Sequence, residues 1–572
     1  MHDPATMKIA LIRVACLTAC LWTLTDVGIA GDTSRAAVVA ADHELASAAG
    51  VEILQQGGNV VDAAVATSFA LAVVRPESCG LGGGGFMLIW NAGTQESIAL
   101  DYRERAPAAA TPDMFTSDGD DPAASRRGGL AVGVPGTVAG LCFALEHYGT
   151  LGRDQVLAPA IRLARDGFPI DATLRDGRSD VLQELADVRD ASPRFAPLSE
   201  LYFDRIEGHE QFRSPLGDVL ERIAAEGPAG FYEGPVGAAI VATVREQGGV
   251  LTADDLQHVE PVVRRPLEGE FVGLTILSMP PPSSGGIALL ETLGILAAYE
   301  RVHPDRSLTA LGHNTPEYIH LVAEALKHAF ADRARFLGDA DFVDVPVDGL
   351  LNPDAIARIA GQIDPHAVLS PDAYGRHSLP DDAGTSHFSI IDAAGNAVAC
   401  TETINTTYGS LVVVPPYGIV LNNQMDDFTS APGRPNAFGL VQSEANAITA
   451  GKKPLSSMTP TIAVRDGKAQ YVAGASGGPR IISATLQVLL NMSRFGMTPQ
   501  QAVSAARFHH QWSPDELRLE PGIAEAAATA LNLKGHAVTR IAELAAAQAA
   551  ARTATGVVGG SDPRKGGVPR GW

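Results

Sequence analysis

The feature that most constrains this chain is a polar loop that runs directly into an alternating hairpin pattern. The loop ends at Gly384, and the strand pattern begins at Thr385 in the run TSHFSIIDAAGNAVACTETIN. One face of this extended strand carries Phe388 and Ile390. The opposite face carries Thr385, His387, Ser389 and Ile391. The residues from 392 to 396 include Gly and Asn and predict a turn before a second strand.

The register of this hairpin follows from the turn. If Ile391 pairs with Ala397, Thr385 lies opposite Thr403, with a Cβ separation of about 4.5 to 5.5 Å. Asn405 then follows one step further along the same face. The pattern therefore predicts that a second hydroxyl orients the Thr385 side chain.

Cleavage of the peptide bond before Thr385 would give this residue both a nucleophile and a base. A free α-amino group has a pKa of about 7.7 to 8, so near neutral pH it can accept the proton of its own hydroxyl. No Ser-His-Asp set is needed for this chemistry. The alternative from the hairpin alone is a threonine-rich structural element without catalysis.

Three separated segments are polar where a packed core would not favour polarity. Arg103 offers a planar fork that can bind a carboxylate through two hydrogen bonds. Acceptors for an ammonium group are offered by Asn405, Gln424 and Asp427. Hydroxyl donors for a carboxylate are offered by Ser456 and Ser457. Each segment alone also fits an ordinary hydrogen-bonded turn, but together they match the head group of a free α-amino acid.

Several sequence strings resemble one known family. The run from Thr385 to Ser389 matches the pattern T-x-H-(F/Y/L)-S, before whose threonine the γ-glutamyltranspeptidase (γ-glutamyltransferase) family cuts itself. Further matching strings are GNVVDAAVA, LGGGGFML, PGTVAG, MPPPSSGG, ADRARFLGD, NNQMDDF, PLSSM and RFHHQW. The resemblance extends from about Ala36 to Arg564, and the family belongs to the N-terminal-nucleophile hydrolases.

The resemblance implies an α+β fold, a four-layer αββα sandwich. It also implies self-cleavage between Gly384 and Thr385 into a large fragment, 31–384, and a small catalytic fragment, 385–572, which remain associated. The implied reaction transfers the γ-glutamyl group of glutathione or a related amide, through a γ-glutamyl-threonine ester, to water or to an amino acid or peptide acceptor. No cofactor or metal is implied.

The resemblance also assigns roles to residues. The α-carboxylate of the donor is bound at the positions of Arg103, Ser456 and Ser457. The α-amino group is bound at the positions of Asn405, Gln424 and Asp427. Gly477 and Gly478 match the pair whose N–H groups form the oxyanion hole, while Thr385 is the nucleophile and Thr403 its neighbour.

The chain departs from the family in three places. The oxyanion segment reads ASGGPR, where many members have Pro before the glycines and Ser after them. Phe438 replaces the Tyr that some members carry in a loop over the site. The Ala-rich stretch near residues 523 to 555 has high helix propensity, and we expect it to replace a more usual strand near the C-terminus.

Two rival functions are compatible with parts of this pattern. A cephalosporin or glutaryl acylase of the same fold would cleave a side chain that lacks the α-amino group. Asp427 argues against it, because a buried carboxylate that faces no cation carries a desolvation penalty. An unprocessed, inactive binding or structural relative is disfavoured by the presence of Thr385, Thr403, Asn405, Asp427 and both serines.

Composition limits the remaining classes. A length of 572 residues suggests two or more domains, although the sandwich can absorb most of the chain as one unit. A net charge of -22 argues against nucleic acid as a partner. The run LGGGGFMLIW has glycines before a strand, so it does not match the strand, GxGxxG, helix order of a dinucleotide site. Cys79, Cys142 and Cys400 show no metal-ligand spacing and are expected to be buried small hydrophobes.

The first 30 residues resemble a secretory signal. Lys8 and Arg13 precede the apolar run VACLTACLW, and small residues near Ala30 suit a cleavage site. A periplasmic or secreted protein is therefore expected. The run ending at Cys20 also resembles a bacterial lipobox, which would instead anchor the protein through a lipidated cysteine.

Secondary structure is legible in several segments. Strands are expected for AAVVAAD, FMLIW and IALDYRER, and helices for HELASAAGVEILQQ and VDAAVATSFALAVV. The region from about 130 to 375 is expected to be largely helical, with long helices at 287–302 and 316–336. The prolines of MPPPSSGG exclude a helix there. Short strands and loops are expected after the hairpin.

Overall fold

The predicted hairpin is present, and it lies in the middle of a seven-stranded sheet. A computed structural model of the chain describes residues 33–115, 123–186, 194–370, 373–374, 384–429 and 444–572. The signal predicted for residues 1–30, Cys20 and Phe438 lie outside these residues. Strand β9 (Ser386–Asp392) pairs with β10 (Ala397–Thr403), and Ile391 faces Ala397 as the turn predicts.

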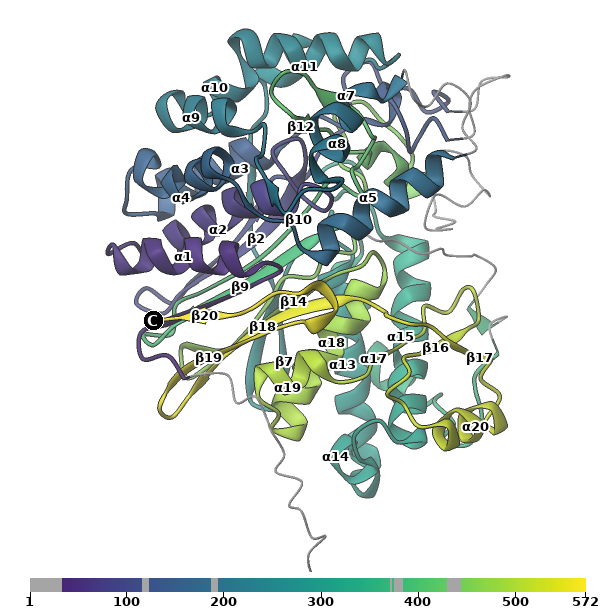
Figure 1. Cartoon of the computed structure of the whole chain (residues 1–572). Coiled ribbons are helices and arrows are strands. Elements are labelled where there is room, and N and C mark those ends of the chain that lie inside the picture. Colours follow the sequence, from purple (N-terminus) through teal and green to yellow (C-terminus); the bar gives the residue numbers. More distant parts are fainter. Residues whose placement is uncertain (1–32, 116–122, 187–193, 371–372, 375–383, 430–443) are drawn as a thin grey trace, which may run out of the picture. The chain divides into compact units, whose positions relative to one another are not determined.

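Figure 1 shows the two main sheets, and each of them is antiparallel throughout. The first sheet has the order β20-β1-β9-β10-β2-β3-β6; its other strands are β20 (Arg570–Gly571), β1 (Ala37–Ala41), β2 (Gly84–Asn91), β3 (Glu96–Asp101) and β6 (Val262–Arg264). The second sheet has the order β19-β18-β14-β13-β8-β7; its strands are β19 (Gly556–Ser561), β18 (Ala546–Thr553), β14 (Lys468–Ser476), β13 (Thr461–Arg465), β8 (Leu274–Ser278) and β7 (Leu267–Phe271).

The inner faces of the two sheets share one core. On β2, Phe86, Leu88 and Trp90 join this core, while Met87 and Ile89 point to the helices on the outer face. This alternation follows from the period of two in a strand. On β9 the same rule places Phe388 and Ile390 on the outer face, as expected.

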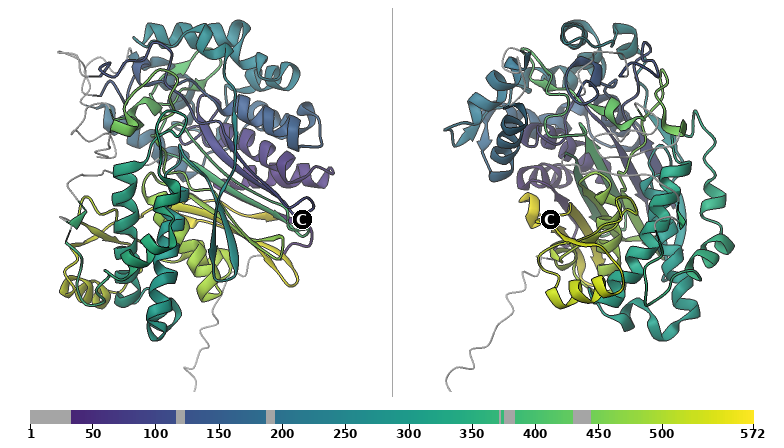
Figure 2. Two further views of the ribbon diagram at one scale, coloured as in Figure 1. Left: turned by 180° about the vertical axis from the view of Figure 1, so that it is seen from behind. Right: turned by 90° about the vertical axis from the view of Figure 1, so that its right-hand side faces the viewer.

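Helices cover both outer faces, so the four layers are αββα (Figures 1 and 2). The first sheet is covered by α1 (Glu44–Gln55), α2 (Val60–Val74) and α3 (Thr137–Tyr148), and the same core extends to α4 (Arg153–Asp166), α5 (Ala172–Leu185), α9 (Gly217–Glu226) and α11 (Gly234–Glu246). The second is covered by α13 (Gly285–Val302), α18 (Arg480–Phe495) and α19 (Pro499–Ser504); α15 (Pro316–Phe336) and α17 (Pro353–Ala360) pack on α13, and α20 (Glu525–Leu533) packs on α15. The expected long helices at 287–302 and 316–336 are confirmed as α13 and α15.

The two predicted fragments both contribute strands to each sheet. In the first sheet, β9 and β10 of the 385–572 segment lie between β1 and β2 of the 31–384 segment. In the second, β13 pairs with β8 across the same division. The bond before Thr385 lies outside the strands, so a cut there breaks no strand pairing. The ladders of hydrogen bonds can therefore hold the two segments together.

The expectation that the Ala-rich stretch replaces a strand is wrong, because part of it forms one. Residues 525–533 are helical, but Ala546–Thr553 forms strand β18, which pairs with β14 and β19. Pairing on both edges satisfies its backbone groups, and this tertiary context overrides the intrinsic preference of Ala for helix. Alanines also suit the narrow space there, where Ser389 of β9 donates to the carbonyl of Gln548.

The middle region is largely helical as expected, but it also supplies strands β6, β7 and β8. Cys79, Cys142 and Cys400 are buried and unpaired, as expected. Among the described residues, none of the helices combines the length and apolarity needed to cross a membrane.

Close approach of the sheets makes Gly474 of β14 critical. A Cβ built at Gly474 would lie 2.2 Å from Cε1 of His387, two residues after Thr385. We expect Gly474→Ala to lower the free energy of unfolding by about 1 to 3 kcal/mol, the usual range for overpacking. It should also slow cleavage before Thr385. Urea unfolding and a denaturing gel measure the two effects.

Gly80→Ala is the matched control, because a Cβ at Gly80 meets no heavy atom within 4 Å. A Gly474→Ala protein as stable as the control would contradict this account of the sheet spacing.

Candidate active site

Thr385 lies against Thr403, as the hairpin register predicts. Their hydroxyl oxygens are 3.1 Å apart, and both side chains are buried. The pairing of Ser386 with Glu402 is the last of the ladder, and it brings the two threonines together one residue beyond. The predicted geometry of the hairpin is therefore confirmed.

Thr403 also contacts the peptide bond that precedes Thr385. Its hydroxyl lies 2.9 Å from the carbonyl oxygen of Gly384, which also accepts a short hydrogen bond from the Thr385 hydroxyl. The backbone N–H of Asn405 donates to Thr403 Oγ1 over 2.8 Å. Because that oxygen accepts from Asn405, its own proton is available for Gly384. Asn405 has φ of 82°, a left-handed conformation that Asn tolerates, and it turns the chain out of β10.

His387 does not provide a base for Thr385. Its Nδ1 lies 2.8 Å from Thr401 Oγ1 and its Nε2 lies 3.1 Å from Ser389 Oγ. Burial lowers the pKa of His387 to about 3, so the ring is neutral at physiological pH. Because both ring nitrogens contact other hydroxyls, the chemistry at Thr385 must draw its base from elsewhere.

Lys565 is a contact of Thr385 that the sequence did not predict. Its ammonium donates to the carbonyl oxygen of Thr385 and lies 2.9 Å from Oδ2 of Asp42. Asp42 Oδ1 accepts from Gln548 over 2.6 Å. Lysine in a C-terminal turn carries no sequence signal for this role, since the contact depends on how β1, β9 and β18 pack together.

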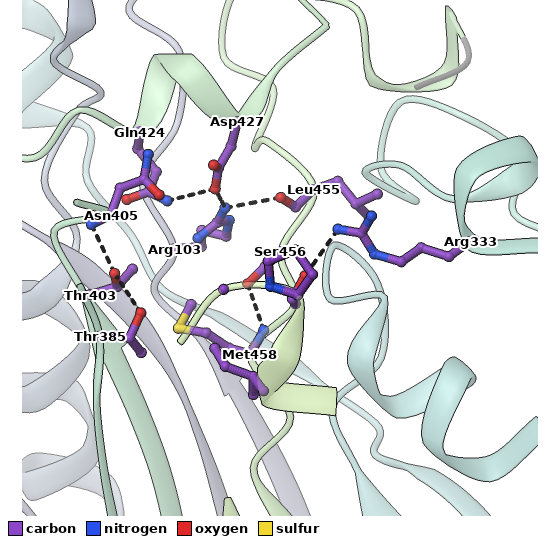
Figure 3. A pocket seen from close by; sticks show the side chains of 14 residues that line it. Arg103, Arg333, Thr385, Thr403, Asn405, Gln424, Asp427, Leu455, Ser456 and Met458 are labelled. Atoms are coloured by element: carbon purple, nitrogen blue, oxygen red, sulfur yellow. Dashed lines mark hydrogen bonds and ion pairs between the residues drawn. The ribbon is translucent and has the colours of Figure 1, made fainter. Parts of the chain in front are cut away.

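A pocket opens beside Thr385, and Figure 3 shows its side chains. It gathers nearly all the predicted residues, together with Arg333, which was not predicted. Its lining residues are Arg103, Arg333, Thr385, Thr403, Asn405, Gln424, Asp427, Leu455, Ser456, Ser457, Met458, Gly478, Pro479 and Ile481. Of the predicted set, Gly477 and Gly384 do not line this pocket; they adjoin Gly478 and Thr385 in the chain.

Arg103 and Asp427 pair with each other in this pocket (Figure 3). Arg103 Nη2 lies 2.5 Å from Asp427 Oδ2, and the same guanidinium donates to the carbonyls of Pro454 and Leu455. Asp427 therefore has a cation partner within its own chain, and the expectation that only a substrate ammonium could supply one is wrong. Its physical reason is that a buried carboxylate can be neutralised by an arginine of its own chain.

Two buried carboxyl groups lie near the Arg103 guanidinium. Glu104 lies 3.9 Å from the guanidinium, but burial raises the pKa of Glu104 to about 8, so it is largely uncharged near pH 7. Burial also raises the pKa of Asp427, and Arg103 opposes that shift. Asp427 is thus the principal counter-charge of Arg103.

Gln424 adds an acceptor to the same side of the pocket. Its amide nitrogen donates to Asp427 Oδ2 over 2.8 Å. Its Oε1 is buried and has no hydrogen-bond partner among the described residues. The η5 turn, Gln424–Asp427, thereby presents a carboxylate and a free acceptor together.

The serine loop is held by the MPPPSSGG segment. Ser456 donates its backbone N–H to the carbonyl of Pro282 over 2.9 Å, and its own carbonyl accepts from the Ser284 hydroxyl over 2.6 Å. Ser283 donates to the carbonyl of Met458 over 2.6 Å. The proline-rich string therefore positions Ser456 and Ser457.

Gly477 and Gly478 connect β14 to α18. Both have positive φ, 126° and 56°, which side chains rarely adopt without strain. Helix α18 begins two residues later at Arg480, so this junction lies at a helix N-terminus, where backbone N–H groups favour negative charge. This suits the predicted oxyanion role, although the turn is followed by Pro479.

One cluster of metal-binding residue types occurs among the described residues, and none of its members lines the pocket. His320, Glu324 and His536 are buried together. His320 Nδ1 and His536 Nε2 are 2.8 Å apart, a hydrogen-bond distance, and Glu324 pairs with Lys327. These contacts already satisfy the facing atoms, so they form a hydrogen-bonded core network.

Comparison with known proteins agrees with this geometry. The chain matches the sequence model of the family described as Gamma-glutamyltranspeptidase over residues 46–572. The protein belongs to the γ-glutamyltranspeptidase family. A relative named Glutathione hydrolase proenzyme, from Escherichia coli (strain K12), is 41% identical over 544 residues, covering 93% of this chain and 91% of the relative.

Solved structures agree on the fold. Cephalosporin acylase from Bacillus halodurans aligns with a TM-score of 0.81 at 27% identity, over 95% of this chain and 97% of that chain. Gamma-glutamyltranspeptidase from Pseudomonas nitroreducens complexed with L-DON aligns with a TM-score of 0.52 at 37% identity, over 57% of this chain and 94% of that chain. The sandwich of the N-terminal-nucleophile hydrolases is therefore confirmed, and sequence identity favours the glutathione hydrolases over the acylase.

The position of the Thr403 hydroxyl predicts how Thr403 variants affect the rate of self-cleavage. Its hydroxyl is placed to stabilise negative charge on the Gly384 carbonyl oxygen during cleavage, and losing such a donor costs about 10²- to 10³-fold in rate. We expect Thr403→Val, which keeps the shape, to slow self-cleavage by that factor. Thr403→Ser should retain most of the rate. Timed denaturing gels measure both, and equal rates for the Val and Ser variants would contradict the assignment.

Proposed function

We propose that the protein is a self-cleaving γ-glutamyltranspeptidase and glutathione hydrolase. The observation that carries this proposal is the contact of Thr385 and Thr403 with the Gly384 carbonyl, at the edge of a pocket with two arginines, a carboxylate and two serines. The name of the Escherichia coli relative supports the same activity.

Self-cleavage begins with Thr385. Its hydroxyl oxygen adds to the Gly384 carbonyl carbon, the C–N bond breaks, and the nitrogen takes up the hydroxyl proton. The ester that forms between Gly384 and Thr385 is then hydrolysed by water to a Gly384 carboxylate and a free hydroxyl. The attack is intramolecular, for which effective molarities on the order of 10⁵ to 10⁸ M are known.

The new α-amino group then serves as the base in turnover. It takes the Thr385 proton as the hydroxyl attacks the γ-carbonyl of glutathione or a related amide, and it gives the proton to the departing amine. Backbone N–H groups of Gly477 and Gly478 stabilise the oxyanion. Water, an amino acid or a peptide resolves the γ-glutamyl ester.

The two charged groups of the donor replace the ion pair between Arg103 and Asp427. Arg103, Ser456 and Ser457 bind the α-carboxylate, while Asp427 and the amide groups of Asn405 and Gln424 bind the α-ammonium. The free Oε1 of Gln424 suits this second role. Two charged ends held on one side fix the γ-carbon near Thr385.

We also propose export of the protein. The basic residues, apolar run and small residues of segment 1–30 favour cleavage near Ala30 and a periplasmic or secreted enzyme. Lipidation at Cys20 is the alternative, and mass spectrometry of the mature N-terminus distinguishes the two.

The first test concerns the nucleophile. Thr385→Ala should leave one intact chain without activity, because no hydroxyl is left to attack Gly384. Thr385→Ser should cleave slowly. In the parent protein, N-terminal sequencing of the small fragment should start at Thr385, and a different start would refute the assigned bond.

The second test uses pH to isolate Asp427. Its pKa is raised above the ordinary value, so falling pH protonates it early and removes the partner of the substrate ammonium. The ratio of kcat/KM for γ-glutamyl over glutaryl anilide should therefore fall as pH falls. Titration of the Thr385 amine affects both substrates and cancels in this ratio.

Asp427→Ala is the matched variant for this test. It should lose roughly 30- to 4000-fold in kcat/KM toward the γ-glutamyl anilide, equivalent to about 2 to 5 kcal/mol, and its ratio should become independent of pH. It should still cleave itself. Equal rates on both anilides by the parent protein would instead indicate an acylase.

A further inference from the structure

Arg333 is a buried arginine of the pocket that forms no ion pair with any of the described carboxylates. It lies near the end of α15, its side chain is about 1% exposed, and none of the described carboxylates lies within 4 Å of its guanidinium. Only two of its three nitrogens are satisfied. Nε donates to Ser284 Oγ over 2.7 Å, and Nη2 donates to Ser457 Oγ over 3.0 Å.

The third nitrogen, Nη1, is buried and has no hydrogen-bond partner among the described residues. An unmatched buried donor on a charged group is costly, so its retention beside a pocket indicates that a ligand completes it. The charged residues lining the pocket are Arg103, Arg333 and Asp427. They leave an excess of one positive charge after Arg103 and Asp427 neutralise each other.

Contacts of Ser457 point to the same ligand. A hydroxyl has one proton and two lone pairs. Since Ser457 Oγ accepts from Arg333, its own proton remains to be donated elsewhere. Ser456 is arranged in the same way, because its Oγ accepts from the backbone N–H of Met458 over 3.1 Å. Both serines therefore present donors, which an anionic group would accept.

We propose that Arg333 is a second carboxylate-binding arginine of this pocket, orienting Ser457 and offering Nη1–H to the α-carboxylate of the donor substrate. The inference rests on the proposed function and extends it to a residue of the α15 helix. Burial lowers the pKa of Arg333 to about 10, which still leaves it charged at neutral pH. Arg103 and Arg333 then approach the carboxylate from two different elements.

The test compares Arg333→Gln with Arg335→Gln. Arg335 is exposed on the same helix and does not line the pocket, so it is a matched control for charge and helix position. Hydrolysis of γ-glutamyl-p-nitroanilide gives KM and kcat, and competition gives inhibition constants for L-glutamate, glutarate and 4-aminobutyrate. The first two competitors carry the carboxylate that Arg333 is proposed to bind, whereas 4-aminobutyrate lacks it.

We expect Arg333→Gln to raise KM and the inhibition constants of L-glutamate and glutarate by roughly 10- to 100-fold, the effect of losing a hydrogen bond to a charged group. The value of kcat should change less than about threefold, and the inhibition constant of 4-aminobutyrate less than about twofold. Arg335→Gln should match the parent. Self-cleavage of each variant reports correct folding.

Two outcomes overturn the proposal. One is an Arg333→Gln protein that binds L-glutamate and glutarate as the parent does, and the other is an equal loss for all three competitors, which indicates a structural role. If Arg333→Gln does not cleave itself, Arg333→Lys provides the test. Lysine keeps the positive charge but lacks the planar guanidinium, so we expect it to raise the inhibition constants of L-glutamate and glutarate by about three- to tenfold. A parent protein that does not hydrolyse the γ-glutamyl anilide would refute the proposed function instead.

Discussion

The pairing of β9 with β10 is the interaction on which the site depends. Because a slip of one residue would turn every β9 side chain to the other face, a single register places Thr385 against Thr403. The register is fixed by burial on both faces, with Phe388 and Ile390 against the helices and His387 against Gly474 of the second sheet. The position of the candidate nucleophile is therefore a property of the whole sandwich.

Central placement of this hairpin also explains how a cut chain can stay folded. Strands β9 and β10 are flanked on both sides by strands that precede Gly384 in the chain. Lys565 adds a direct link, since its ammonium joins the Thr385 carbonyl to Asp42 at the end of β1. An N-terminal nucleophile needs a free terminus that does not fray, and pairing on both edges of β9 supplies that restraint.

Local patterns predicted the hairpin, its register and the two long helices, because each depends on periodicity and turn chemistry within one segment. The site residues were recognised through family strings, and the structure brings nearly all of them to one pocket. Three features escaped the sequence. The sequence of strand β18 predicts a helix because alanine favours helix. Its alanines instead fit the narrow space between the two sheets, which the sequence does not show. Arg333 and Lys565 have ordinary local contexts, and only tertiary packing brings them to the site.

In the proposed binding mode, the mutual neutralisation of Arg103 and Asp427 favours a zwitterionic head group. In the substrate-free chain the two charges satisfy each other at 2.5 Å, so neither bears the full cost of burial. A γ-glutamyl head group brings one carboxylate and one ammonium, so it can give Arg103 and Asp427 each a new partner, with Arg333 as a second cation beside the carboxylate. A glutaryl group brings only the carboxylate, so in this binding mode it would draw Arg103 away from Asp427 without supplying an ammonium in its place. Discrimination between the two thus comes mainly from the unpaired charge that the wrong substrate leaves behind.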